Sequence, residues 1–176
     1  MQGSLTVNGC DHSLSLHILH SWCHLQVFRG KLSEVEPLVR KAIKKKRRAV
    51  GDAHPHTLQF IKLLVNILKK QGKVAEAEPL ARQSVKRLRR AFGDAHPDTL
   101  FALNALGDLL QEQGKLMEAE PLFREALDGR RNVFGDAHPE TLESTKSLGC
   151  LFMQQKKLSE AEPLLREMID GSRRVF

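Results

Sequence analysis

Histidine and cysteine gather near the N-terminus at a spacing that could hold a metal ion. The residues are His12, His17, His20, Cys23 and His24. In a helix over 17–27, His20 and His24 would share a face with Cys23 beside them, and imidazole and thiolate are ligands of zinc. No second convincing ligand pair lies elsewhere in the sequence. We therefore expect a decayed first helix whose polar face has drifted to histidine, with no metal and no cofactor. Zinc binding by this segment is the alternative.

Three more histidines recur at a fixed interval. His54, His96 and His138 are 42 residues apart, and each precedes a proline within Gly-Asp-Ala-His-Pro. Proline at or near the first helical position is typical of a helix start. One imidazole per unit would be spread along a stack of units and would not converge on one ion. We therefore expect these histidines to serve the turns that precede helices.

The sequence lacks the common catalytic motifs. It has no Gly-rich phosphate loop, no H-E-x-x-H pair and no G-x-S-x-G nucleophile turn. Serine, histidine and aspartate are present, but the repetition disperses them along the chain. We therefore expect a protein without enzyme activity.

The composition narrows the class of protein further. The chain has 176 residues, 41% of them hydrophobic, and only three cysteines, Cys10, Cys23 and Cys150. No apolar run reaches the roughly 18–20 residues that cross a bilayer, and the first 30 residues do not resemble a signal peptide. An odd number of widely spaced cysteines does not build a disulfide framework. We expect a cytoplasmic protein with reduced thiols and no membrane partner.

The chain repeats itself every 42 residues. The string Gly-Asp-Ala-His-Pro begins at Gly51, Gly93 and Gly135, and a Glu-Pro-Leu string recurs four times at the same interval. Residues 93–134 and 135–176 are identical at about 25 of 42 positions. The predicted organisation is an N-terminal tail at 1–8, a degenerate first repeat at 9–50, and repeats at 51–92, 93–134 and 135–176.

Each unit is predicted to contain two helices. From Pro97 to Gln113, leucines recur every three or four residues, which is the helical period, and Gly114 ends the segment. A second helix is predicted over 117–133. Ser33 and Glu36 have the spacing of a capping box at the start of the second helix in the first unit. Two helices per unit, each with one apolar face, favour a stacked α-solenoid.

The pattern Leu103-x2-Leu106-Gly107-x2-Leu110, followed by Ala119-x3-Phe123, resembles the tetratricopeptide repeat. The 42-residue period, with G-x-x-H-P-x-T between units, resembles the repeats of kinesin light chains and nephrocystin-3-like proteins. The resemblance covers about 9–176. It implies an all-α, right-handed superhelix of about four helix-turn-helix repeats, whose first helices line a concave groove that binds peptides. A kinesin heavy chain or a cargo adaptor would be a partner by resemblance only.

Exposed columns of the first helices are therefore the candidate site. The predicted groove residues are His20, His24, Lys62, Asn66, Lys69, Phe101, Asn104, Asp108 and Lys146. In the first three units these columns offer amides, histidines and lysines with few acids. Amides can pair with a peptide backbone, and lysine attracts carboxylates. We expect a scaffold that binds extended, acidic peptide segments of a protein partner, and the cargo-binding part of a kinesin light chain is an alternative.

The net charge of +7 comes largely from basic runs near the ends of the second helices. These runs lie at 44–48, 86–90, 130–131 and 173–174. Cations in the last turn oppose the negative end of the helix dipole, so we expect a solvated ridge. The ridge has no interleaved aromatic residues, and we expect no specific nucleic-acid binding. A structural array whose basic ridge contacts polyanions is the remaining alternative.

The sequence stops at Phe176, where another Gly-Asp-Ala-His-Pro string would begin. The apolar residues Leu164, Leu165, Met168 and Ile169 would then lack a following helix to cover them. We expect either a fragment of a longer array or end-to-end self-association.

Overall fold

The computed structural model describes the backbone of residues 13–52 and 54–175. Within these ranges the side chains are described except at 13–17, 19, 20, 24, 55, 172, 174 and 175. The described chain forms eight helices: α1 (Ser13–Phe28), α2 (Leu32–Val50), α3 (Pro55–Lys70), α4 (Val74–Phe92), α5 (Pro97–Glu112), α6 (Leu116–Phe134), α7 (Pro139–Gln154) and α8 (Leu158–Val175).

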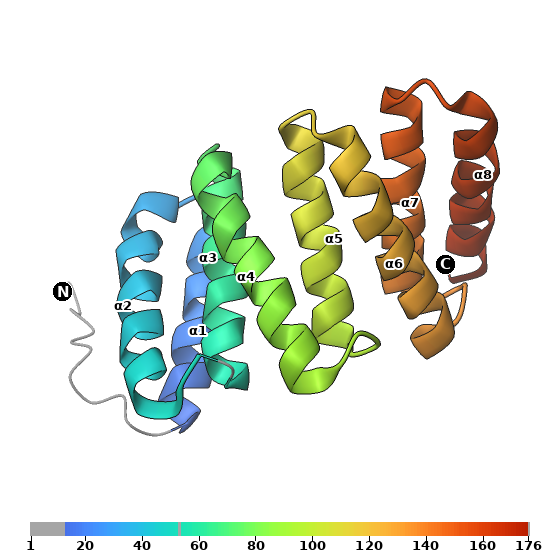
Figure 1. Cartoon of the computed structure of the whole chain (residues 1–176). Coiled ribbons are helices and arrows are strands. Elements are labelled where there is room, and N and C mark those ends of the chain that lie inside the picture. The colour runs from blue at the N-terminus through green and yellow to red at the C-terminus, as the bar shows by residue number, and fades with distance from the viewer. Residues whose placement is uncertain (1–12, 53, 176) are drawn as a thin grey trace.

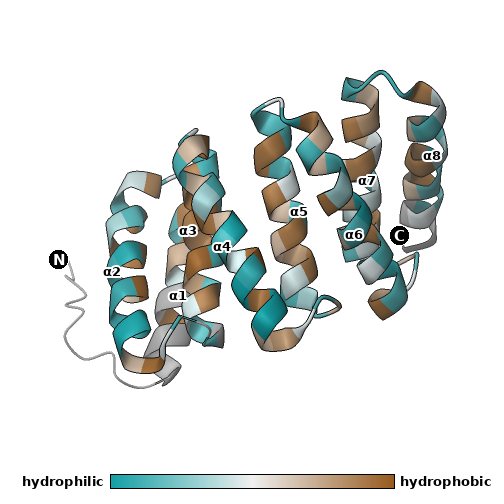
Figure 2. Cartoon of the chain, viewed as in Figure 1, coloured by the Kyte–Doolittle hydropathy of each residue, from teal (hydrophilic) through white to brown (hydrophobic). Residues whose placement is uncertain are grey.

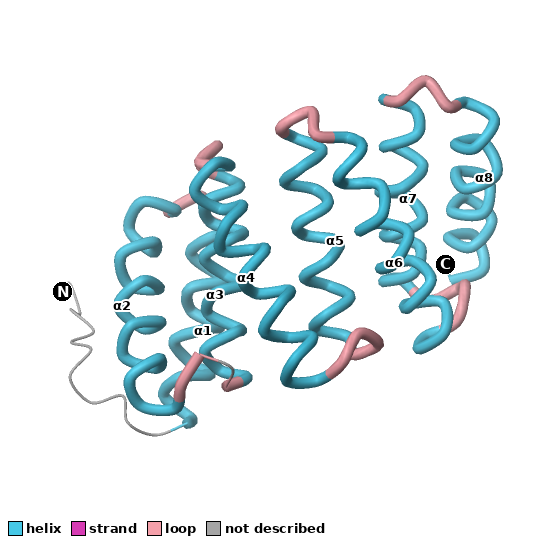
Figure 3. The backbone as a smooth tube through the Cα atoms, viewed as in Figure 1, coloured by secondary structure: helices cyan, strands magenta, loops and turns pink. Residues whose placement is uncertain are grey.

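Consecutive helices pair, and the pairs stack side by side along one direction (Figure 1; Figure 3). We call the pairs α1–α2, α3–α4, α5–α6 and α7–α8 repeats 1 to 4. The predicted all-α solenoid of helix-turn-helix repeats is confirmed. The outer boundaries of the repeats and the tail at 1–8 stay predictions, and the tail lies outside the described residues.

The turn inside each repeat requires a left-handed backbone. Gly30, Gly72 and Gly114 have φ angles of 76°, 73° and 74°. In repeat 4 the same position is Lys156, which adopts φ 61°. A residue with a Cβ is strained in this region, whereas glycine is not. Repeat 4 therefore keeps the turn of the other repeats at a conformational cost.

The turn between repeats is built around the recurring histidine. The Nδ1 atoms of His54, His96 and His138 accept hydrogen bonds from the backbone N–H two residues on, at 3.2, 3.1 and 3.2 Å. The imidazoles of His96 and His138 also stack on Phe92 and Phe134, with ring centroids 4.6 and 4.5 Å apart. Each histidine thus caps a helix N-terminus. The prediction that these histidines serve turns is confirmed.

The predicted capping box at the second helix is wrong. Helix α2 begins at Leu32 with Lys31 at the N-cap position, and no side chain caps it. Ser33 and Glu36 therefore lie inside the helix. The Glu36 carboxylate instead accepts hydrogen bonds from Arg40 and from Lys73 of the next repeat, both at 2.8 Å.

Apolar side chains form one core cluster that extends along the array. Figure 2 shows that each helix carries both hydrophobic and hydrophilic residues. Phe123 is fully buried, and it lies so close to Gly107 that a Cβ on that glycine would be 2.7 Å from the ring. Gly107 therefore lets α5 and α6 approach closely. At the end of the array, Ile169 remains 46% exposed on α8, while Leu164, Leu165 and Met168 are half-buried. End-to-end self-association stays a prediction.

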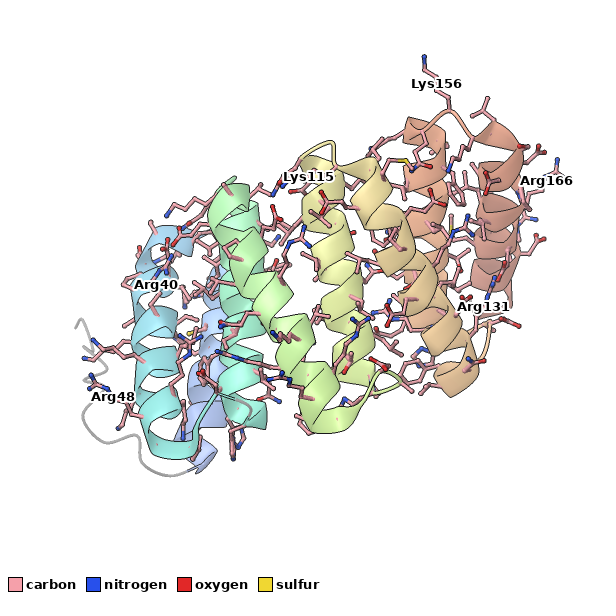
Figure 4. All side chains as sticks on the ribbon, viewed as in Figure 1. Arg40, Arg48, Lys115, Arg131, Lys156 and Arg166 are labelled. Atoms are coloured by element: carbon pink, nitrogen blue, oxygen red, sulfur yellow. The ribbon has the colours of Figure 1, made fainter. Side chains whose placement is uncertain are left out.

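A ladder of ion pairs joins the second helix of each repeat to the next repeat. Arg82 donates to Glu78 in its own helix at 2.8 Å and to Glu118 of repeat 3 at 2.6 Å. Lys115 of repeat 3, labelled in Figure 4, donates a hydrogen bond of 2.8 Å to the Glu78 carboxylate. Hydrogen bonds from Lys115 and Arg82 lower the pKa of Glu78 to about 2.

Equivalent pairs link the other neighbouring repeats. Arg40 contacts Glu36 and Glu76, and Arg124 contacts Glu120 and Glu160. In each pair that joins two repeats, the arginine and the glutamate are 36 residues apart. The contact therefore recurs with the sequence repeat. Single exposed pairs contribute little to stability, but a repeated set favours one stacking register.

Candidate binding groove

Five of the predicted groove residues meet at one pocket between repeats 2 and 3. Lys62, Asn66 and Lys69 come from α3, and Phe101 and Asp108 come from α5. Residues of α4 also line the pocket, so it is recessed between three helices. Its volume is about 370 Å³, which lies within the range of ligand pockets.

The inner lining of this pocket is apolar. It is formed by Leu58, Leu63, Val65, Ala81, Leu88, Phe92, Ala102 and Ala105. The polar part of the lining consists of the predicted lysines, the amides of Gln59 and Asn66, the Ser84 hydroxyl and the carboxylates of Asp98 and Asp108. The arrangement resembles other binding pockets, in which an apolar interior buries one group and a few polar groups orient it.

Both lysines of the pocket already have acidic neighbours. The Nζ atom of Lys62 lies 3.4 Å from the centroid of the Phe101 ring and 3.9 Å from Oδ1 of Asp98. Lys69 Nζ lies 3.3 Å from Asp108 and 3.2 Å from Glu112. The sequence columns did not reveal these neighbours, because each carboxylate comes from the following repeat.

Burial perturbs the charged groups of the pocket. Desolvation lowers the pKa of Lys62, although Asp98 and Glu140 favour its charged form. Desolvation also raises the pKa of Asp108, against the opposing effect of Lys69. Charges in this setting interact more strongly than they would in water. A ligand carboxylate near Lys62 would therefore compete with Asp98 for one ammonium group.

The remaining predicted residues are not brought to this pocket. Asn104 is only 7% exposed, and its amide accepts from Ser144 at 3.1 Å and donates to Ser147 at 3.5 Å. Asn104 therefore links α5 to α7. It also lines a smaller hollow toward α7, so its part in peptide binding stays a prediction. Lys146 lies on α7 and pairs with Glu143 at 2.8 Å. The side chains of His20 and His24 lie outside the described residues.

A smaller hollow of about 280 Å³ continues from the pocket toward α7. It shares Phe101, Ala105 and Asp108 with the larger pocket and ends at Glu140 and Glu143. The two hollows together form a groove that crosses the first helices of repeats 2, 3 and 4. Acidic side chains dominate the α7 end, whereas lysines lie on α3.

The pocket exists because small residues stand where another repeat has large ones. Ala102 and Ala105 of α5 are 42 residues after Phe60 and Leu63 of α3. Phe60 is 2% exposed, so a large ring is buried at the position that Ala102 takes in the next repeat. The same alignment places Ser144 on α7, at the contact between repeats 3 and 4. There a side chain of α6 occupies part of the space.

Arg130 of α6 occupies the space beside Ser144. It is 2% exposed and donates to the Ser144 hydroxyl at 2.8 Å and to the Glu140 carbonyl at 2.7 Å. A 2.7 Å ion pair joins it to the Glu140 carboxylate. The prediction of a solvated last-turn cation is therefore wrong for Arg130, because a hydroxyl, a carbonyl and a carboxylate of the next repeat contact its two terminal nitrogens. The equivalent residue in repeat 2 is Leu88, which leaves the pocket open.

The tetratricopeptide repeat family model matches residues 56–130 and 102–174, which together span more than half of the chain. The chain belongs to the tetratricopeptide repeat family. No curated protein matches the sequence.

Several solved structures share this fold at low sequence identity. A kinesin light chain-like protein with nearly identical repeats from Podosopora anserina has a TM-score of 0.83 and 21% identity, covering 94% of this chain and 79% of that one. BtubC from P. vanneervenii has a TM-score of 0.78 and 16% identity, with coverages of 91% and 62%. A Rap protein in complex with Competence and Sporulation Factor has a TM-score of 0.77 and 12% identity, with coverages of 90% and 42%.

The predicted basic ridge does not run along the whole tetratricopeptide array. Arg89 pairs with Asp94 and Glu125, and Arg131 pairs with Asp136 and Glu167. With Arg130 buried, the last turn of α6 offers little free positive charge. Among the described side chains of this face, Lys41, Lys44, Arg48, Lys86 and Arg90 of repeats 1 and 2 have no carboxylate within ion-pair distance.

The described residues form neither a metal site nor a membrane span. Cys23 is fully buried, and desolvation raises the pKa of its thiol to about 11, which disfavours a thiolate. Within the described part of the chain, no group of His, Cys, Asp and Glu side chains is arranged to hold a metal ion. His12 and the side chains of His17, His20 and His24 lie outside that part. Across 13–52 and 54–175, none of the helices is long and apolar enough to cross a membrane.

Proposed function

We propose that this array is a non-enzymatic scaffold that binds an extended peptide segment of a protein partner in the groove across α3, α5 and α7. The observation that carries the proposal is the open pocket between repeats 2 and 3. Its apolar interior accepts one large apolar side chain of the segment, and burying such a side chain contributes about 1.5–3 kcal/mol.

Acidic residues of the peptide would lie beside the lysines of α3. A carboxylate that replaces Asp98 near Lys62, or Asp108 near Lys69, would form an ion pair at the rim. Asn66, which lines the same pocket, can bond to the peptide backbone through its amide. In this arrangement the apolar side chain provides most of the affinity, and the acidic residues fix its register and direction.

The test is fluorescence anisotropy of labelled acidic peptides, each with one large apolar residue, at physiological salt and with single-stranded RNA as competitor. Ala102→Phe places in repeat 3 the side chain that stands at the aligned position of repeat 2. We expect it to weaken binding at least tenfold without lowering thermal stability. Gln154→Phe, which adds the same ring at an exposed position of α7 that does not line the groove, is the matched control.

Substitution of Lys62 by Gln separates the two parts of the proposal. It should weaken the binding of acidic peptides about three- to tenfold. The affinity for a neutral peptide with the same apolar residue should not change. Equal binding of all peptides by the wild type, Ala102→Phe and Lys62→Gln would exclude the groove as the binding site.

A second candidate is the cargo-binding part of a kinesin light chain. The fold similarity to a kinesin light chain-like array, over 94% of this chain, favours it. Its partners would be a cargo adaptor or a kinesin heavy chain. Co-purification with a heptad-repeat segment of a kinesin heavy chain, or with an adaptor peptide that Ala102→Phe releases, tests it. The assignment is contradicted if the heptad-repeat segment does not co-purify and Ala102→Phe releases no adaptor peptide.

A further inference from the structure

The outer face of repeats 1 and 2 carries a basic cluster that the groove does not use. Lys41, Lys44 and Arg48 are exposed on α2, and Lys86 and Arg90 are exposed on α4. Of the described residues, no carboxylate lies within ion-pair distance of these five side chains. Arg48 projects away from α2 in Figure 4.

Repeats 3 and 4 differ at the aligned positions. The position of Lys44 and Lys86 is taken by Asp128 and Asp170, and that of Lys41 and Gln83 by Glu125 and Glu167. The two glutamates pair with Arg89 and Arg131 of the preceding repeat. A uniform helix-stabilising pattern would place cations at every helix end. The excess charge therefore belongs to one end of the array and not to the repeat in general.

A hollow of about 420 Å³ opens beside this cluster. Arg40, Lys44, Arg47 and Arg48 surround an apolar floor formed by Ile43, Ile61, Leu64 and Leu80. Arg47 pairs with Asp52 at 2.7 Å, but Gln83 stands where later repeats supply a glutamate from the next helix. Arg40 is also paired, with Glu36 and Glu76, so the hollow combines the uncompensated charge of Lys44 and Arg48 with a recessed apolar surface.

The hollow is separate from the groove. The two share no lining residue. Leu64 faces the hollow and Lys62 faces the groove, and residues two apart on a helix point to nearly opposite sides. One array can therefore hold two segments at once, one on each side of α3.

We propose that this basic hollow binds an acidic segment of a protein, with one aliphatic side chain of the segment on the apolar floor. The charge requires an anionic ligand, and the recessed floor requires an apolar group between the anionic ones. No aromatic ring lines the hollow for the stacking of a nucleobase. The headgroups of a planar bilayer would contact Lys44 and Arg48 without reaching the floor. An array with both sites bridges two protein segments.

The test uses two labelled 12-residue peptides of Glu and Asp that carry either Leu or Ser at the centre. At about 0.15 M salt, where exposed charges are largely screened, we expect the Leu peptide to bind about tenfold more tightly than the Ser peptide. Lys44→Gln/Arg48→Gln should weaken the Leu peptide about tenfold. Lys156→Gln/Arg173→Gln removes the same charge from exposed positions at the far end and should change affinity by less than twofold.

Three outcomes overturn the proposal. Equal affinity for the Leu and Ser peptides shows that the apolar floor is not used. Single-stranded RNA or vesicles with 30% phosphatidylserine that bind in a Lys44- and Arg48-dependent way, while the peptides do not, reassign the cluster to another polyanion. If Ala102→Phe abolishes binding of the Leu peptide and Lys44→Gln/Arg48→Gln leaves it intact, the peptide occupies the groove, which supports the proposed function and removes the second site.

Discussion

Repeat 3 packs against two neighbours, and the two contacts differ at the groove floor. Toward repeat 2, Leu88 and Ala102 leave a pocket of about 370 Å³. Toward repeat 4, Arg130 and Ser144 stand at the aligned positions and are hydrogen-bonded to each other. The ladder pairs are the same at both contacts. The comparison indicates that a strongly repeated sequence can keep its stacking and still open one interface by changing two positions.

The largest expected effect comes from removing the arginine that is buried between repeats 3 and 4. Arg130→Ala deletes a buried side chain with hydrogen bonds to Ser144 and Glu140, so we expect a loss of about 2–4 kcal/mol in the free energy of unfolding. Leu88→Ala, at the aligned position beside the larger pocket, should cost about 2 kcal/mol, the low end for a buried leucine, because a pocket already adjoins this side chain. Urea denaturation of both variants checks the difference. A smaller loss for Arg130→Ala than for Leu88→Ala would mean that the hydrogen bonds of Arg130 do not stabilise this interface.

The ladder should contribute equally to both contacts. Glu78→Gln and Glu120→Gln each weaken hydrogen bonds to a lysine of the next repeat, and each should cost about 1–2 kcal/mol. A clearly larger cost for one of them, in chemical denaturation at pH 7, would show that the interfaces differ in more than the groove floor.

The same glutamates predict an acid dependence of stability. The pKa values of Glu36 and Glu78 in the folded chain are about 2, below the ordinary value of 4.5. Their contribution is therefore complete above about pH 4.5 and is lost as the pH falls toward 2, because protonation then favours the unfolded chain. Unfolding measured from pH 7 to 2 should show this loss, and Glu78→Gln should reduce it. If Glu78→Gln does not reduce the loss of stability at low pH, other carboxylates cause that loss.

The smallest expected effect lies in the turns that precede α6 and α8. Lys156→Gly should stabilise repeat 4 by about 0.5–1 kcal/mol, because φ 61° costs nothing for glycine. Gly114→Ala should destabilise repeat 3 by a similar amount. Thermal unfolding of the two variants gives shifts of opposite sign if the turns are equivalent. A destabilised Lys156→Gly would indicate that the lysine side chain makes a contact of its own.

Periodicity predicted the fold well. The first helix of repeat 3 was expected over 97–113 and extends from Pro97 to Glu112, and its partner was expected over 117–133 and extends from Leu116 to Phe134. The helical spacing also placed Lys62, Asn66 and Lys69 on one face. These features depend on the local helical pattern and on the 42-residue repeat, both of which are visible in the sequence.

The missed features depend on contacts between repeats. The helical pattern places Asn104 and Arg130 on exposed faces of their own helices. In the structure both side chains form hydrogen bonds with Ser144 of α7. The acidic neighbours of Lys62 and Lys69 also come from the next helix. A signal was present, since Ala102 and Ser144 break the column that begins with Phe60, and partners in the ladder recur at intervals of 36 and 37 residues.

The most direct test of the account is methyl NMR of the array during titration with the tightest groove peptide. The account predicts that the methyl signals of Leu88, Ala102 and Ala105 shift most, while those of Ile43 and Leu80 on the outer hollow do not. Shifts confined to the outer hollow, or to α7 and α8, would contradict the claim that the open interface between repeats 2 and 3 is the binding site.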